Sequence, residues 1–297
     1  MISAPVGAPR YRQRYMLARV LLPTVVAAAL AGCGGGGSGG AGAPAPATAG
    51  SADPATTATA TAPQPVRYRL YYLEGEHLRA APAASDAEPT AQQVVEELVA
   101  NPGGHTTAIP EATEVNGVTS GGGTAVVDLS RAFESGGGSL SMQARVAQVV
   151  FALTQFAWIE RVTIRLDGEE VEAIGGEGVP ARELGREGFA DLLPPIFVEQ
   201  PLEGDAVTSP LTVRGDARVF EANVSLRLET AAGEVFGETF ATAAEGAPGR
   251  GPFRAEIAFA VDEPTAAELV AYEESADDGS EQHVVRVPVR LCPAGGC

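Results

Sequence analysis

Residues 139–168, SLSMQARVAQVVFALTQFAWIERVTIRLDG, hold a helix pattern, a strand pattern and a turn in immediate succession. The apolar residues of the first part recur at helical spacing, which predicts an amphipathic helix over 139–157. They are Met142, Val146, Val149, Val150, Leu153 and Ala157. Apolar residues then alternate over 161–166, which predicts a strand with Val162, Ile164 and Leu166 on one side. Asp167-Gly168 predicts a turn into a short final strand at Val171.

The residues upstream of this segment predict a small α+β domain. VRYRLYYL (66–73) alternates as a strand does, and Thr90-Ala-Gln-Gln93 is a capping box before the apolar helix face at 94–99. We expect a glycine hairpin at 114–118 and a further strand at 124–129. The order of elements favours two helices on one face of a three- or four-stranded sheet within residues 66–175.

Several blocks of this unit resemble the GerMN domain, a module of bacterial sporulation and germination lipoproteins. The blocks are IPEATEVNGV (109–118), TAVVDLSRAF (124–133), ARVAQVVFALTQF (144–156) and VTIRLDGE (162–169). The resemblance implies protein–protein assembly in the cell envelope. It brings no catalytic residue to this sequence.

Residues 194–292 change to short alternating runs with turn signals every 8–12 residues, which is typical of a β-sandwich of about seven strands. Trp158, the one tryptophan, lies in the first unit, and no cysteine pair spans the second, so an antibody-type core is excluded. The interval 176–193 is expected to be a linker with room for one short helix at 181–184. The fold class expected is an α+β domain followed by an all-β immunoglobulin-like sandwich.

The second unit resembles the immunoglobulin-like Gmad family, which is associated with germination proteins and often follows a GerMN module. The matching residues are Pro201, Gly204, Ser209-Pro210-Leu211, Gly215 and Phe220-Glu221. Two adjacent domains in the expected order are a more specific signal than either domain alone.

The 297 residues contain 20 Lys+Arg and 38 Asp+Glu, for a formal net charge of −18. All the basic residues are arginines, which excludes enzymes that need a lysine, such as Schiff-base formers and phosphate-loop ATPases. The negative charge repels phosphate backbones, so no nucleic-acid partner is expected.

Residues 1–32 have the composition of an export signal: an arginine-rich start without acids, then the 13-residue apolar run VLLPTVVAAALAG (20–32). Leu30-Ala31-Gly32-Cys33 resembles the lipobox of bacterial lipoproteins. The resemblance implies that Cys33 receives a diacylglycerol and becomes the mature N-terminus, whose fatty-acyl chains, palmitate among them, anchor the protein. The alternative is an ordinary signal peptide that happens to end at a cysteine.

Residues 33–65 are rich in Gly, Ala, Pro and Thr and contain one charge, Asp53, which predicts a disordered tether outside the cytoplasm. At the other end, Cys292 and Cys297 flank PAGG, and residues 293–297 form a tail. In an oxidising compartment a disulfide between these cysteines is plausible, and two free thiols are the alternative.

No pattern in the sequence predicts catalysis, a metal site or a cofactor. His77, His105 and His283 stand outside any metal or triad motif, and each is interpreted as a solvated or incidental histidine. Two acidic clusters, 167–170 and 277–281, are interpreted as solvated loops. The aromatic group Phe151, Phe156 and Trp158 is interpreted as core and helix-edge packing.

Two hypotheses follow for the function. The first is a lipid-anchored protein on the extracytoplasmic face of the cell membrane that binds envelope proteins or itself. The second is an accessory module that binds peptidoglycan or another wall glycan for an enzyme on another chain. A third hypothesis, that the chain is itself a wall hydrolase, rests only on its number of acidic residues.

Overall fold

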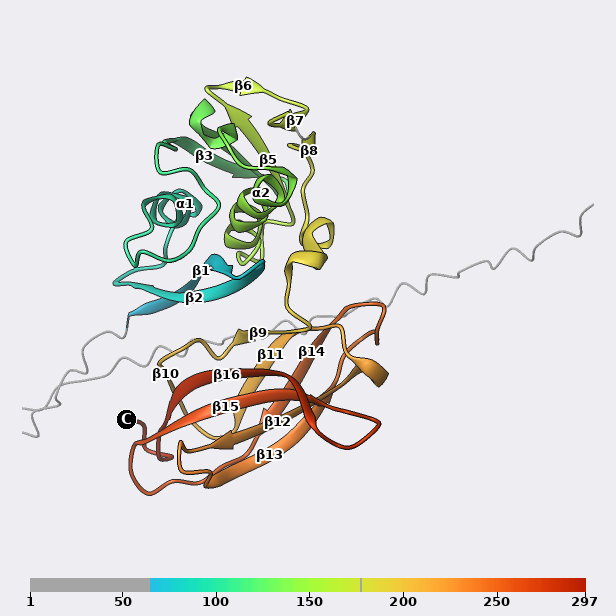
Figure 1. Cartoon of the computed structure of the whole chain (residues 1–297). Helices are drawn as coiled ribbons and strands as arrows, with labels where there is room; N and C mark the ends of the chain where they lie inside the picture. The colour runs from blue at the N-terminus through green and yellow to red at the C-terminus, as the bar shows by residue number, and fades with distance from the viewer. Residues whose placement is uncertain (1–64, 177) are drawn as a thin grey trace, which may run out of the picture. The chain divides into compact units, whose positions relative to one another are not determined.

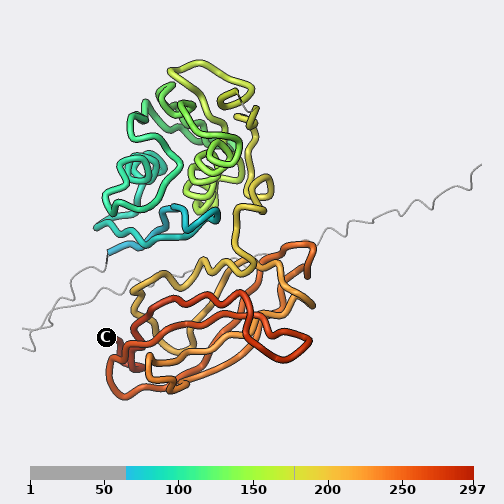
Figure 2. Tube along the Cα trace, viewed as in Figure 1, coloured from blue at the N-terminus to red at the C-terminus, as the bar shows by residue number. Residues whose placement is uncertain are grey.

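The computed structural model describes residues 65–176 and 178–297 (Figures 1 and 2). The export signal, the lipobox with Cys33 and nearly all of the predicted tether lie outside these residues. The described residues form one compact unit. In the described part of the chain, none of the helices has the length and apolar character needed to cross a bilayer.

The first domain combines two α-helices with a four-stranded sheet and two hairpins. The sheet has the order β3-β4-β5-β6, and β4 and β5 run parallel. The hairpins are β1-β2 and β7-β8. The elements are β1 (Val66–Glu74), β2 (His77–Ser85), α1 (Ala91–Ala100), β3 (Val115–Gly121), β4 (Thr124–Leu129), α2 (Ser139–Leu153), β5 (Arg161–Leu166), β6 (Glu169–Glu170), β7 (Ala173–Ile174) and β8 (Val179–Pro180). The α+β class predicted for this domain is confirmed.

Local signals set most boundaries of these elements. The Thr90 hydroxyl oxygen accepts a hydrogen bond from the backbone N–H of Gln93, and Gln93 Oε1 accepts one from the backbone N–H of Thr90, so the capping box starts α1. The alternation in β5 buries Val162, Ile164 and Leu166 as predicted. Helix α2 ends at Leu153, four residues earlier than the periodicity predicts, at the cap Thr154.

The hairpins of the first domain differ from the prediction. The strand at 66–73 pairs with β2. The strand β2 was not predicted because its sequence, HLRAAPAAS, consists mostly of small residues, alanine above all. The turn between β3 and β4 lies at Gly122-Gly123, where both φ angles are positive, and not at 114–118. Asn116-Gly117 instead lies at a register shift between these strands.

Helix α2 carries two buried polar side chains in its apolar surroundings. The Arg145 guanidinium donates to the carbonyl oxygens of Phe133, Ser135 and Gly136 at 2.6–3.0 Å. Gln148, fully buried, donates to the carbonyl of Tyr71 at 2.7 Å and accepts from the backbone N–H of Ala108 at 2.9 Å. These bonds tie the loop before α2 and the strand β1 to the helix.

The interval 176–193 is part of the first core, which differs from the expected linker. Its apolar side chains are buried with those of the two helices: Val179, Ala181, Leu184, Phe189, Leu192 and Leu193. The predicted helix at 181–184 is absent, because Leu184 forms an isolated bridge with Val162 of β5. A 3-10 helix, η2 (Arg186–Leu192), follows instead.

The second domain is a sandwich of a five-stranded and a three-stranded sheet. Their orders are β10-β16-β15-β12-β13 and β14-β11-β9. The strands are β9 (Ile196–Gln200), β10 (Asp205–Val207), β11 (Leu211–Ala217), β12 (Asn223–Glu229), β13 (Val235–Thr242), β14 (Gly251–Ile257), β15 (Thr265–Glu274) and β16 (Glu281–Leu291). A separate core cluster lies between the sheets, so the all-β class is confirmed, with eight described strands against about seven expected.

The C-terminal tail is tied back to the sandwich. The structure joins Cys292 and Cys297 by a disulfide, with Cα atoms 5.1 Å apart. The backbone N–H of Cys292 donates to the carbonyl of Val207 in β10 at 2.8 Å.

Tyr72 of β1 makes the first domain sensitive to alkaline pH. Its ring stacks on His105, with centroids 4.5 Å apart, and its buried hydroxyl oxygen has no hydrogen-bond partner. Burial first, and then the Glu97 carboxylate, raise the pKa of Tyr72 from 10.0 to about 12. The folded state therefore holds the Tyr72 proton more tightly than the unfolded state does. The free energy of unfolding keeps its full value below the ordinary tyrosine pKa of 10.0, and this contribution is lost as the pH rises through about 12.

We expect Tyr72→Phe to keep the parent stability near neutral pH and to lose less stability than the parent as the pH is raised to about 12. Urea denaturation across that pH range measures both quantities. Equal alkaline losses in the two proteins would contradict the assignment.

Candidate functional site

The histidines singled out in the sequence lie apart from one another. His77 lies at the start of β2, His105 stacks on Tyr72, and His283 Nε2 lies 3.6 Å from a carboxylate oxygen of Glu273. Across residues 65–176 and 178–297, no three His, Cys, Asp or Glu side chains are grouped as a metal site.

The acidic cluster at 167–170 is neutralised by arginines. Arg131 pairs with Asp167 and Glu169, and both Arg165 and Arg182 pair with Glu170. In the second cluster, Asp278 accepts hydrogen bonds from Ser280, and Glu281 pairs with Arg227. These carboxylates serve as ion-pair and turn partners, so neither cluster presents a free carboxylate pair of the kind a glycosidase uses.

The aromatic group at the end of α2 and just beyond it has buried and exposed members. Phe151 and Phe156 are buried, as expected for core packing. Trp158 is 54% exposed and packs on Phe156 just beyond the end of α2, with ring centroids 4.7 Å apart, as expected for helix-edge packing.

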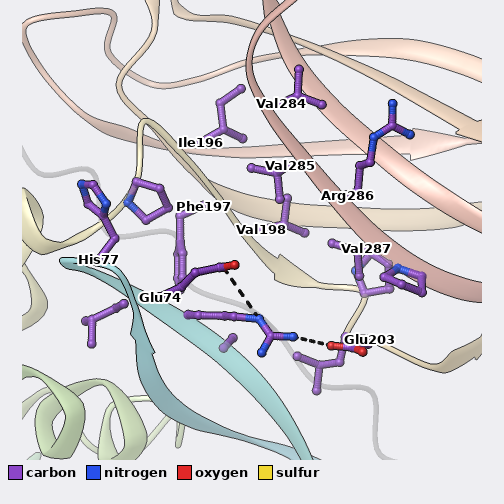
Figure 3. Close-up of a pocket in the computed structure, with 17 residues that line it drawn as sticks. Glu74, His77, Ile196, Phe197, Val198, Glu203, Val284, Val285, Arg286 and Val287 are labelled. Atoms are coloured by element: carbon purple, nitrogen blue, oxygen red, sulfur yellow. Dashed lines mark hydrogen bonds and ion pairs between the residues drawn. The ribbon is translucent and has the colours of Figure 1, made fainter. Parts of the chain in front are cut away.

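A groove of about 630 Å³ lies where the first domain meets the sandwich (Figure 3). One wall comes from β2, another from the segment around β9, and a third from β16. Its lining is mainly apolar, with valines of β9 and β16 toward its centre (Figure 3). The lining residues are Glu74, His77, Leu78, Arg79, Ala80, Pro194, Ile196, Phe197, Val198, Pro201, Leu202, Glu203, Val284, Val285, Arg286, Val287 and Pro288.

Each strand that borders the groove has an edge without a strand partner in the described part of the chain. Strand β2 pairs only with β1, and β9 pairs only with β11. Strand β16 pairs with β15 on one side, but on the other side β10 covers only Val289–Leu291. Residues 281–287 of β16 therefore have no strand partner along one edge, while the Pro288 carbonyl accepts a hydrogen bond from the backbone N–H of Gly204 at 2.8 Å. Residues 284–288 line the groove.

The charged groups at the rim pair with other side chains. Arg79 pairs with Glu203 and, at 4.0 Å, with Glu74 (Figure 3). Arg286 pairs with Glu229 at 2.8 Å and Glu268 at 3.0 Å. Because these charges are balanced, the groove favours an uncharged occupant.

Arg186 of η2 joins the end of α2, strand β1 and strand β9. It donates to Thr154 Oγ1 after α2 at 2.7 Å and pairs with Glu199 of β9. Its guanidinium lies 4.7 Å from the centre of the Phe151 ring, and it also contacts the hydroxyl of Tyr71 in β1 at 3.4 Å. Arg67 Nη2 of β1 adds an ion pair at 2.8 Å with Asp205 of β10.

Most of these residues could not be predicted from the sequence. Nothing in its local pattern separates Arg186 from the chain's other arginines, and the strand β2 was not expected at all. Arg145 and Gln148 carried a usable signal, since each is polar and stands within the densest apolar run of the chain.

Family models match both domains. The model described as sporulation and spore germination (Germane) matches residues 69–172, and the model of the immunoglobulin-like domain of bacterial spore germination (Gmad2) matches residues 195–280. No curated protein matches the chain.

Solved structures align at low similarity. The tandem GerMN domains of the sporulation protein GerM from Bacillus subtilis align with 22% identity over 66% of this chain and 62% of that structure, at a TM-score of 0.38. The first GerMN domain of the same protein aligns with 28% identity over 41% of this chain and 98% of that structure, at a TM-score of 0.34. A putative lipoprotein from Clostridium perfringens aligns with 20% identity over 43% of this chain and 93% of that structure, at a TM-score of 0.32.

The two family models match in the order and at the places where the α+β domain and the sandwich lie. The chain therefore carries a GerMN domain of the sporulation and spore germination type followed by a Gmad-type immunoglobulin-like domain.

Proposed function

We propose that this chain is a lipid-anchored protein of the extracytoplasmic face of the cell membrane that acts by binding and not by catalysis. The apolar run at 20–32 and the Leu30-Ala31-Gly32-Cys33 sequence support the anchor. The sporulation and germination type of both domains supports a role among envelope proteins. The ion pairs of the carboxylates at 167–170 with arginines support a role in binding over a role in catalysis.

The groove supports binding of an extended segment of a partner protein. An added strand gains main-chain hydrogen bonds from an unpaired sheet edge, and pockets beside that edge receive its alternate side chains. Three such edges meet at an apolar groove here, and this is the observation that carries the proposal. The occupant that fits is an uncharged strand rich in β-branched residues.

A photo-crosslinking amino acid placed at Val284 tests this proposal in cells. Val284 lines the groove and is 41% exposed, and the matched control Val235 is 48% exposed on β13, away from the groove. We expect adducts with an envelope protein from position 284 and not from position 235. The crosslinked residues should map to one extended segment of that partner. Equal adduct patterns from the two positions, or none from either, would overturn the proposal.

Self-association is the other form of the same function. Sedimentation of the soluble fragment 60–297 over a range of concentrations distinguishes self-association from binding of a different protein. A second copy in the groove makes the measured mass depend on concentration. If the crosslinked partner is this same chain, that dependence must be present and must weaken in Val287→Arg, which places a charge in the groove.

A further inference from the structure

A second hollow, of about 450 Å³, lies between η2, the end of strand β11 and the start of strand β14. Part of its wall is apolar and comes from Phe151, Leu193, Phe197 and Pro248. Arginines and acidic residues form most of the rest. A hollow of this size, with mixed apolar and polar walls, is typical of a site for a small molecule.

The charges of this hollow are balanced. Every charged side chain that lines it belongs to an ion pair: Arg186–Glu199, Arg218–Asp191, Arg250–Asp216 and Arg161–Glu187. A charged ligand would have to break one of these pairs and leave a charge without its partner. The hollow therefore favours a neutral ligand over an ion.

Asp216 is an acceptor whose hydrogen bonding is incomplete. The guanidinium of Arg250, whose side chain is only 7% exposed, donates through Nη2 to the carbonyl of Pro194 at 2.6 Å. Its Nη1 atom lies 3.7 Å from Asp216 Oδ1, which is longer than a hydrogen bond. Burial raises the pKa of the Asp216 carboxyl, although Arg250 opposes the shift. Because a third of the Asp216 side chain is still exposed, a ligand hydroxyl group can reach it and donate to it.

Arg218 follows Asp216 by two residues and supplies donors to the same hollow. Its Nη2 atom donates to Asp191 at 2.7 Å, and 36% of its side chain is exposed. A guanidinium carries five N–H groups, so this one bond leaves donors for a ligand. An acceptor and a donor in one hollow match two adjacent hydroxyl groups, one that donates to Asp216 and one that accepts from Arg218.

A sugar or cyclic polyol is neutral, with hydroxyl groups at the edge of its ring and apolar C–H groups on its faces. It can therefore use both the polar and the apolar parts of this wall. We propose that the hollow binds a neutral sugar or cyclic polyol, with adjacent hydroxyl groups on Asp216 and Arg218 and C–H groups on the apolar wall. This site does not rest on the protein partner proposed for the groove, although the two share the lining residue Phe197.

Saturation-transfer NMR of the full-length protein in detergent tests the proposal. The neutral probes are glucose, N-acetylglucosamine and myo-inositol, and the charged probes are leucine and acetate. We expect saturation to reach the C–H protons of at least one neutral probe, and neither charged probe to displace it. Tightest binding of myo-inositol assigns a polyol, and tightest binding of glucose or N-acetylglucosamine assigns a sugar.

Two variants locate the binding. Arg218→Met removes the donors and keeps the length of the side chain, and the fold loses little because the partner Asp191 is 90% exposed. It should weaken binding of the neutral probe about tenfold or more. Ala190→Phe fills the hollow and should abolish binding. The matched control is Arg254→Met on β14, which removes a surface arginine paired with Glu256 outside the hollow and should bind as the parent does.

Three results would overturn the proposal: no binding of any neutral probe, displacement of the neutral probe by leucine or acetate, or unchanged binding by folded Arg218→Met and Ala190→Phe proteins. Because Val284 lines the groove and not the hollow, none of them bears on the crosslinks expected from Val284.

Discussion

Replacing Arg145 by Met is expected to lower the free energy of unfolding by about 3 kcal/mol or more, because buried acceptors that lose a charged donor cost about 1–3 kcal/mol each. The guanidinium serves three backbone carbonyls of the loop that precedes α2. Met fills the space of the side-chain stem without donating. Urea denaturation of the parent and the variant measures the difference, and a loss below about 1 kcal/mol would contradict this role.

The glycine tract before α2 provides a matched control for the same feature. A Cβ on Gly137, whose φ is +79°, would lie 2.6 Å from Ser141 Oγ and 2.9 Å from Arg145 Nη2. A Cβ on Gly138 would meet nothing within 4 Å, and its φ is negative. We therefore expect Gly137→Ala to destabilise the domain by more than about 1 kcal/mol and Gly138→Ala to leave it nearly unchanged.

Replacing Arg186 by Ala is expected to uncouple the two domains. The change removes the bonds that η2 makes to α2, β1 and β9 and leaves the half-buried Glu199 without its cation. Removing one partner of a buried pair costs about 3–5 kcal/mol, and the partial exposure of this pair reduces the expected loss to about 2–3 kcal/mol. In urea, the parent should unfold in one transition and the variant in two.

Arg161→Ala is the control for that experiment. Arg161 pairs with Glu187 of η2, but both side chains are largely exposed, so the pair contributes little. The control should unfold as the parent does. A single unshifted transition in Arg186→Ala would show that this arginine does not couple the domains.

The sequence predicted the elements whose residues repeat with a clear period. The apolar faces of α1 and α2 and the alternation in β5 and β12 follow from burial of one side of a regular element. Strand β2 was missed because alanine and proline give no alternation, and its pairing with β1 depends on the turn at Gly75. The turn between β3 and β4 was predicted at the wrong place because both Gly117 and Gly122-Gly123 are turn signals. Only the pairing register of the two strands decides between them.

The groove could not be predicted, because it depends on where strands lack partners. Local sequence indicates the strands β9 and β16 but not β2, and the unpaired edges of all three strands follow from the sheet order. Arg186 is a second case, since its four partner residues, Tyr71, Phe151, Thr154 and Glu199, come from β1, the end of α2 and β9.

The placement of the groove outside the cell rests on the cysteine at position 33. Intact-mass analysis of the protein extracted from membranes, together with fractionation of Cys33→Ala, tests that placement. We expect a mature chain that begins at Cys33 and carries a diacylglycerol, and a variant that is no longer retained with the membrane as firmly as the parent. A mature chain that begins at any other residue, or a variant held in the membrane as tightly as the parent, would contradict the account.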